Sequence, residues 1–167
     1  HLDLKTLFKP YFKVPILIAE YFKTWLLAES TLGYVINCDD VLFVQLDEEI
    51  NLSVLSQGEV LFNREQERVN IDHLIVPRLN ELQALINHEL PEIERYQVQH
   101  QITYRAIVQL VDALYPNNIF TNNSDKMKFL CEQINQNERN ALRILDHITD
   151  CFAYVLMNLV NIFSAQR

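Results

Sequence analysis

The chain has 167 residues, of which 49% are hydrophobic and 10% aromatic, and only two are glycine. A chain of this length buries enough apolar surface to close one core without a metal or a disulfide. The scarcity of glycine excludes glycine-rich phosphate loops and argues against a turn-rich β-sandwich. We therefore expect one domain, residues 1–167, with no cofactor and no bound metal.

Charge is distributed unevenly along the chain. The formal net charge is −8, and residues 29–95 hold fourteen acidic residues against four arginines. Phosphate backbones repel such a field, so we expect no nucleic-acid partner. The three cysteines form no Cys-x-x-Cys pair, which is typical of reduced thiols and indicates a cytoplasmic protein. No apolar run has the length of a membrane span, so stable membrane insertion is not expected.

The first third of the chain begins with two predicted helices. Residues 2–13 form an amphipathic segment that Pro10 interrupts, and a second helix follows Pro15 over residues 16–32 and ends at Gly33. Lysines beside aromatic residues can also mark a helix that lies on an anionic membrane. We favour an interpretation in which the aromatic side chains belong to the core and the lysines are solvated, because the two prolines interrupt any long lipid-facing surface.

Residues 34–62 fit two interpretations. The stretches on either side of residues 38–40 have the composition of strands, and those three residues could turn a hairpin. Alternatively, one of the two aspartates there could cap a helix over residues 41–46. We favour the helix with short irregular connections.

Helical periodicity returns after residue 63. Helices are expected over residues 72–86, 91–114 and 124–134, each opened by a capping residue or a proline. Residues 137–165 form the last helix, whose seam recurs at alternating spacings of four and three: Ala141, Leu145, Ile148, Phe152, Val155, Leu159 and Ile162. Its polar residues form a thin stripe, which marks a central helix. The sequence thus predicts an all-α single-domain bundle of about five to seven helices around the C-terminal helix, with a small hairpin or irregular segment possible at 34–62.

Two groupings of polar residues could carry chemistry, and we interpret neither as a site. One lies on a single turn of the last helix: His147, Asp150 and Cys151. A thiol and a base on one helix point outward together, so nothing organises an oxyanion site between them. The other follows a spacing of four: Glu92, Tyr96 and His100. Helical di-metal sites use Glu-x-x-His pairs, which this chain lacks. We expect no enzyme activity and no catalytic residue.

The function expected from these patterns is a non-enzymatic protein–protein interaction domain, such as an adaptor, a chaperone-like component, an inhibitor or an effector module. An acidic docking surface would attract a basic partner protein and speed association; its residues are Asp39, Asp40, Asp47, Glu48 and Glu49. The alternative is a small-molecule sensor with a pocket inside the bundle. The polar groups expected to orient its ligand are His100, Tyr104, His147, Tyr154 and Asn158.

Overall fold

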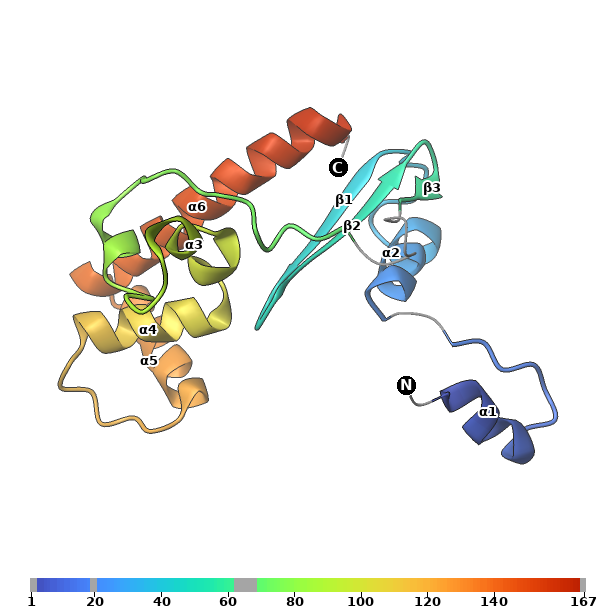
Figure 1. Cartoon of the computed structure of the whole chain (residues 1–167), viewed down its shortest axis with the longest axis horizontal. Coiled ribbons are helices and arrows are strands. Elements are labelled where there is room, and N and C mark those ends of the chain that lie inside the picture. The colour runs from blue at the N-terminus through green and yellow to red at the C-terminus, as the bar shows by residue number, and fades with distance from the viewer. Residues whose placement is uncertain (1–2, 19–20, 62–68, 166–167) are drawn as a thin grey trace.

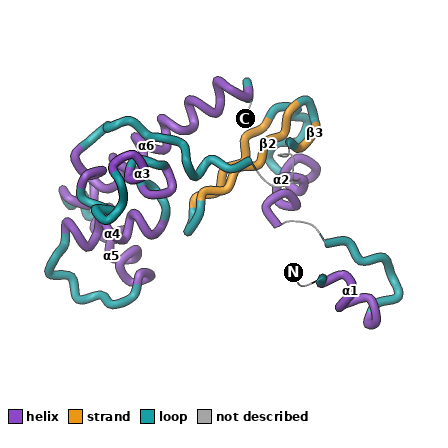
Figure 2. Tube along the Cα trace, in the orientation of Figure 1, coloured by secondary structure: helices purple, strands orange, loops and turns teal. Residues whose placement is uncertain are grey.

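The structure, a computed structural model, describes residues 3–18, 21–61 and 69–165. Six α-helices, three short 3-10 helices and three strands occur in these residues (Figures 1 and 2). In chain order they are α1 (Leu4–Phe8), η1 (Lys9–Tyr11), α2 (Tyr21–Leu32), β1 (Val41–Leu46), β2 (Ile50–Ser56), β3 (Glu59–Val60), η2 (Glu81–Ala84), α3 (Glu92–Arg95), η3 (Val98–His100), α4 (Tyr104–Leu114), α5 (Asn123–Asn135) and α6 (Arg139–Phe163).

The expected all-α fold is wrong, because residues 41–60 form an antiparallel sheet in the order β1-β2-β3. In the register of the first pair, Val44 lies opposite Leu52 and Leu46 opposite Ile50. The hairpin turn is residues 47–49, where the amide of Asp47 donates to the carbonyl of Glu49 at 3.1 Å. The helix that we favoured over residues 41–46 is therefore a strand, and the turn lies after it, not at residues 38–40.

The second turn of the sheet needs a left-handed backbone. Gln57 and Gly58 have φ angles of 52° and 78°, as in the two-residue turns whose twist suits a hairpin. Asp40 holds this turn, because its carboxylate accepts hydrogen bonds from the amide of Gln57 at 3.0 Å and the hydroxyl of Ser56 at 3.3 Å. Asp40 is thus a structural residue of the sheet.

Both faces of the sheet are covered by helices. Ile50, Leu52 and Val54 pack in one cluster with Cys151, Val155 and Leu159 of α6. On the opposite face, Val41 and Leu55 pack with Leu26 of α2, and the ring of Trp25 meets that of Phe43 edge-on with centroids 5.3 Å apart. Strand β1 reads as a nearly continuous apolar run, as strands covered on both faces do. Strand β2 alternates apolar and polar residues from Ile50 to Val54, and this period of two was missed in the sequence.

Helix α6 confirms the predicted long C-terminal helix, although it is not the centre of an all-α bundle. Its first half joins a core with α4 and α5 through Ala141 and Ile144, and its second half covers the sheet. The buried face is rotated from the predicted seam, however. Leu145 and Ile162 are 38% and 67% exposed, whereas His147, which we assigned to the polar stripe, is 1% exposed.

Three other predictions are wrong in part. Residues 72–86 form mostly extended chain with only η2, and the predicted helix over residues 91–114 is divided into α3, η3 and α4. A backbone bridge between Ile75 and Gln97 holds this region, so its backbone pairs with distant residues instead of following helical periodicity. The N-terminal aromatic residues, expected in the core, are exposed, Tyr11 by 78% and Phe12 by 55%.

Other predicted elements are confirmed. The N-terminal helix ends at Phe8 and continues as η1 around Pro10, and α5 covers the predicted helix at 124–134. The predicted end of the second helix is also confirmed, because α2 ends at residue 32 just before Gly33. Its predicted start at residue 16 is wrong, because residues 16–18 are not helical. Within the described ranges, no helix is both long and apolar enough to cross a membrane.

Candidate functional site

A polar pocket of about 340 Å³ lies where the β1–β2 turn meets the start of α4. Seven residues line it: Glu48, Glu49, Asp72, Gln99, His100, Thr103 and Arg105. They come from the hairpin turn, from the extended chain after the sheet, and from η3 and the beginning of α4. The pocket therefore exists only because three distant stretches of the chain are brought together.

Backbone hydrogen bonds fix these three stretches to one another. The amide of Tyr104 donates to the carbonyl of Asp47 at 2.9 Å, and the amide of Gln99 donates to the carbonyl of Asp72 at 3.2 Å. The hydroxyl of Thr103 donates to the carbonyl of Gln99 at 2.8 Å. The backbone thus sets the walls of the pocket. The side chains of Gln99 and Thr103 also take part in hydrogen bonds within the protein.

Asp72 places a buried hydrogen-bond acceptor in the lining of the pocket. Its amide donates to the side-chain oxygen of Asn70 at 2.8 Å, which fixes the backbone at this position. Its Oδ1 atom is buried and has no hydrogen-bond partner among the residues that the structure describes. A buried acceptor without a partner costs free energy, and a donor group on a ligand would supply the missing bond.

Charge in the pocket is mostly negative. Three carboxylates line it, and Arg105 is the cation among the lining residues. The pKa of His100 is lowered, first by burial and then by the positive charge of Arg105, while Glu94 opposes the shift. The imidazole is therefore neutral near pH 7 and can donate one hydrogen bond and accept one. A pocket with both hydrogen-bond donors and acceptors suits a ligand that carries hydroxyl groups, because each hydroxyl donates and accepts a hydrogen bond.

Some of the residues predicted from the sequence meet in this pocket. Glu48 and Glu49, predicted for an acidic docking surface, and His100, predicted for a ligand pocket, line it together. Tyr104 is the first residue of α4 and adjoins it. A basic protein partner for the acidic residues stays a prediction that nothing in the structure tests.

The structure does not gather the other predicted residues into one site. The five acidic residues divide between the two ends of β1, with Asp39 and Asp40 before its first residue and residues 47–49 after its last. Tyr154 and Asn158 lie in the second half of α6, where the side chain of Asn158 donates to the carbonyl of Tyr154 at 2.8 Å. The predicted ligand pocket inside a helical bundle is not formed by these residues.

His147 and Cys151 form a buried structural pair. The ring nitrogens of His147 lie 3.1 Å from the side-chain oxygen of Asn80 and 3.0 Å from the carbonyl of Gln101, and the sulfur of Cys151 lies 3.8 Å from Nδ1. Burial raises the pKa of the Cys151 thiol to about 12, with the charge of Asp150 adding to the shift. A thiol with this pKa is protonated at neutral pH and is a poor nucleophile.

The metal grouping considered from the sequence is not assembled. Glu92 and Tyr96 line a separate pocket with Ile93, whereas His100 belongs to the polar pocket. Within the described ranges, no three residues of the His, Cys, Asp and Glu types are placed to hold a metal ion.

Four residues of the polar pocket were not identified as site residues from the sequence: Asp72, Gln99, Thr103 and Arg105. Asp72 was interpreted as a helix cap and Thr103 as part of a helix interior. Their spacing along the chain carries no motif, because the pocket depends on the pairing of residues 72–76 with residues 96–99.

The α/β fold of the chain resembles that of solved structures, among them ROK family proteins. One is a Listeria monocytogenes protein described as a putative N-acetylmannosamine kinase, with a TM-score of 0.75 and 15% identity over 98% of this chain and 52% of that chain. A second is a ROK family glucokinase from Streptomyces griseus in complex with glucose and AMPPNP, with a TM-score of 0.70 and 15% identity over 99% of this chain and 54% of that one. A third is a ROK family transcriptional regulator, a homologue of the Escherichia coli MLC protein, with a TM-score of 0.75 and 13% identity over 98% of this chain and 40% of that one.

These resemblances concern the fold. The chain spans about half the length of the structures that it matches. No protein-family model matches the sequence, and no curated protein does. The resemblance to sugar kinases and to a regulator nevertheless contradicts two expectations, a protein-interaction adaptor and a chain without enzyme activity.

Proposed function

We propose that this chain is a sugar-sensing domain and that the polar pocket is its sugar site. The observation that carries the proposal is the match of nearly the whole chain to structures whose names refer to sugars, an N-acetylmannosamine kinase and a glucokinase bound to glucose. A transcriptional regulator shares the same fold at a TM-score of 0.75, which supports sensing as a use of this fold.

The chemistry of the polar pocket supports a sugar as the ligand. Each sugar hydroxyl both donates and accepts a hydrogen bond. The carboxylates of Glu48 and Asp72 offer acceptors, the guanidinium of Arg105 offers donors, and neutral His100 offers one of each. The volume of about 340 Å³ falls in the range of small-ligand pockets. A monosaccharide would supply the donor that the buried Oδ1 atom of Asp72 lacks.

Sugar phosphorylation is the second candidate, and the two kinases among the neighbours favour it. The acidic lining of the polar pocket argues against phosphorylation there, because Glu48, Glu49 and Asp72 would repel the phosphates of a nucleotide.

The cytoplasmic location expected from the cysteines remains part of the proposal. All three cysteines are free.

Calorimetric titration of the 167-residue chain with glucose and with N-acetylmannosamine tests the sensing proposal. We expect saturable binding of at least one sugar, and Asp72→Ala should weaken it by about tenfold or more, because a hydrogen bond to a charged group is lost. Asp146→Asn is the matched control, since Asp146 is exposed on α6 outside the pocket.

Two results would count against the proposal. If the Asp72→Ala variant binds sugar as strongly as the parent chain, the polar pocket is not the sugar site. If neither sugar shows saturable binding, the proposed sensing function is refuted. Formation of a sugar phosphate on incubation with sugar, ATP and Mg²⁺, detected by mass spectrometry, would favour the kinase candidate instead.

A further inference from the structure

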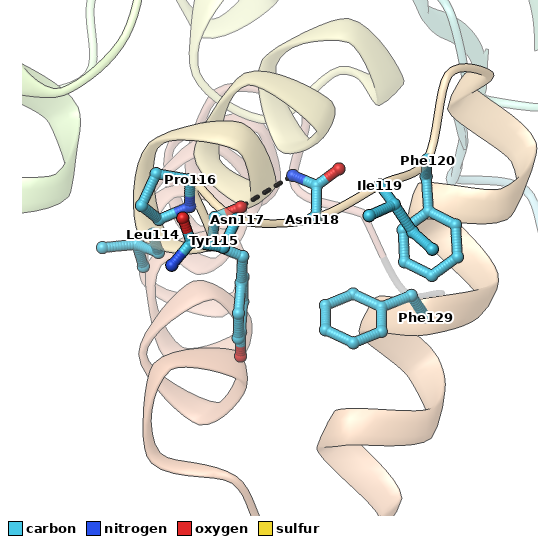
Figure 3. Close-up of a pocket in the computed structure, with 8 residues that line it drawn as sticks. All are labelled: Leu114, Tyr115, Pro116, Asn117, Asn118, Ile119, Phe120 and Phe129. Atoms are coloured by element: carbon cyan, nitrogen blue, oxygen red, sulfur yellow. Dashed lines mark hydrogen bonds between the residues drawn. The ribbon is translucent and has the colours of Figure 1, made fainter.

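A second, apolar pocket of about 510 Å³ lies at the opposite end of α4 from the polar pocket. It is lined by Leu114 at the end of α4, by the loop of residues 115–120 and by Phe129 of α5. Figure 3 shows the rings of Tyr115, Phe129 and Phe120 in a row beside this loop. The two pockets share no lining residue, and the 11 residues of α4 separate them by about 15 Å.

The rings of Tyr115, Phe120 and Phe129 form an aromatic wall, and interactions among the lining residues hold it in place. The rings of Tyr115 and Phe129 meet edge-on at 5.0 Å with an interplanar angle of 87°, and those of Phe120 and Phe129 lie 5.3 Å apart. The hydroxyl of Tyr115 donates to the carboxylate of Glu138, which also accepts from the amide of Ala141 at the start of α6. Tyr115 is therefore anchored at both its backbone and its hydroxyl.

The loop is fixed in the same way on its other side. The side-chain amide of Asn118 donates to the carbonyl of Tyr115 at 2.8 Å (Figure 3). It also donates to the carboxylate of Asp112 at 3.2 Å. The amide of Asn118 also donates to the carbonyl of Tyr115 at 3.0 Å. A wall that is already ordered costs a ligand little conformational entropy, which favours binding by a small molecule.

The lining residues of the apolar pocket also determine which class of ligand can bind there. It contains three aromatic rings, apolar side chains and the amides of Asn117 and Asn118, but no charged group. A charged ligand would lose its hydration here without a partner, whereas a flat apolar ring can stack on or meet the edges of the wall rings. Ile119 is 88% exposed, so an apolar surface lies open at the mouth of the pocket.

We propose that this pocket binds a small, uncharged, planar aromatic molecule, as a site separate from the sugar site. The volume of about 510 Å³ accommodates one or two fused rings and is within the usual range for small-ligand pockets. The aromatic wall supplies the contact area, and the amide of Asn117 at the rim can accept or donate one hydrogen bond to a ring substituent.

Indole is a suitable probe, because it is uncharged and planar and has one hydrogen-bond donor. We expect an NMR titration of the isotope-labelled chain to saturate, with shift changes concentrated at Leu114, Ile119, Phe120 and Phe129. Phe120→Ala should weaken indole binding by about tenfold, since it removes a ring from the wall. Ile162→Ala, at an apolar residue of α6 that is 67% exposed, should leave the affinity unchanged.

A second variant keeps the test decisive if Phe120→Ala disturbs the loop. Ile119 is so exposed that Ile119→Ala cannot remove core packing, and we expect it to weaken indole binding by severalfold. Equal indole affinity in both variants and the parent chain would overturn the proposal. It would also be overturned if the same signals shift on raising the protein concentration without indole and indole does not compete, because another copy of the chain would then occupy the pocket.

Discussion

The amide of Tyr104 donates a hydrogen bond to the carbonyl of Asp47 at 2.9 Å, although the two residues lie in different structural elements. Asp47 begins the β1–β2 turn and Tyr104 is the first residue of α4. This bond joins the turn that carries Glu48 and Glu49 to the helix start that carries Thr103 and Arg105, and all four residues line the polar pocket. The sheet and the helical part of the chain meet at this point.

Tyr104→Pro should remove this bond without breaking α4. Proline is tolerated at the first position of a helix, and Thr103, with φ −69° and ψ 162°, already has the extended backbone that precedes proline. We expect Tyr104→Pro to be less stable than Tyr104→Ala by about 0.5–1.5 kcal/mol, the net contribution of one hydrogen bond. Urea unfolding of both variants measures the difference.

Tyr104→Ala is the control in that comparison, because it loses the same side chain but keeps the amide. Sugar binding should fall further in Tyr104→Pro than in Tyr104→Ala, since the turn is no longer tied to the helix. Equal stability of the two variants would show that the amide bond does not hold the turn.

His147 should make stability fall as the pH falls. Its folded pKa is lowered, first by burial, while the bond to Gln101 and the charge of Asp150 partly oppose the shift. The unfolded chain then binds a proton near its ordinary pKa of about 6.5 and the folded chain does not. The free energy of unfolding is therefore unaffected above this pKa and decreases as the pH falls below it.

His147→Phe separates this effect from the titration of other groups. The variant removes the titrating ring but leaves the carbonyl of Gln101 without its partner, so we expect a loss of about 1–3 kcal/mol at pH 8. Its stability should depend less on pH than that of the parent chain between about pH 7.5 and 5.5, where carboxylates contribute little. Denaturant unfolding across this range tests it, and an unchanged pH slope would contradict the assignment.

His147 also illustrates what could be predicted from the sequence and what could not. The spacing of apolar residues predicted α6 and α5, because those helices bury one face against neighbours. The burial of His147 depends on Asn80 and Gln101, which lie 67 and 46 positions away. Periodicity carries no information about such partners, and it assigned His147 to an exposed polar stripe.

The segment between the sheet and α4 was mispredicted for a related reason. Polar side chains there bind backbone groups in place of a helix: the side-chain oxygen of Gln83 accepts from the amides of Leu79 and Asn80 at 2.6 and 3.2 Å. Such bonds give non-helical backbone to a sequence with helical spacing. Glu48 and Glu49 of the polar pocket could be predicted from the cluster of acidic residues in the sequence. Asp72 and Arg105 could not, because the non-helical backbone of this segment brings them to the pocket.

Asn87 is expected to be one of the most sensitive residues in that segment. It has a φ of 54° and is 6% exposed, and its side chain donates to the carbonyl of His100 at 2.7 Å. Asn87→Gly keeps the left-handed backbone but loses the bond, which should cost about 1–3 kcal/mol. Asn87→Ala should cost about 1 kcal/mol more, because its Cβ strains this conformation.

Asn137 gives a matched comparison for the strain alone. It has a φ of 56° but is exposed, so Asn137→Ala should show only the backbone cost of about 1 kcal/mol. Thermal and urea unfolding of the three variants would test the assignment, and an Asn87→Gly variant as stable as the parent chain would refute the role of the His100 bond.

The three cysteines should differ widely in reactivity with iodoacetamide. Cys131 is exposed, whereas Cys151 is buried and its pKa is raised to about 12 by burial and then by Asp150. Only the thiolate reacts, and at mildly alkaline pH a thiol with this pKa has roughly a thousandth of the thiolate of an ordinary cysteine. Mass spectrometry of the folded chain should therefore show Cys131 labelled first and Cys151 unlabelled.

Unfolding in urea is the control. Cys151 should then react like Cys131, because its pKa shift comes from the folded core. Labelling of Cys151 in the folded chain at the rate of Cys131 would mean that the α6–sheet core around Val155 and Leu52 opens readily.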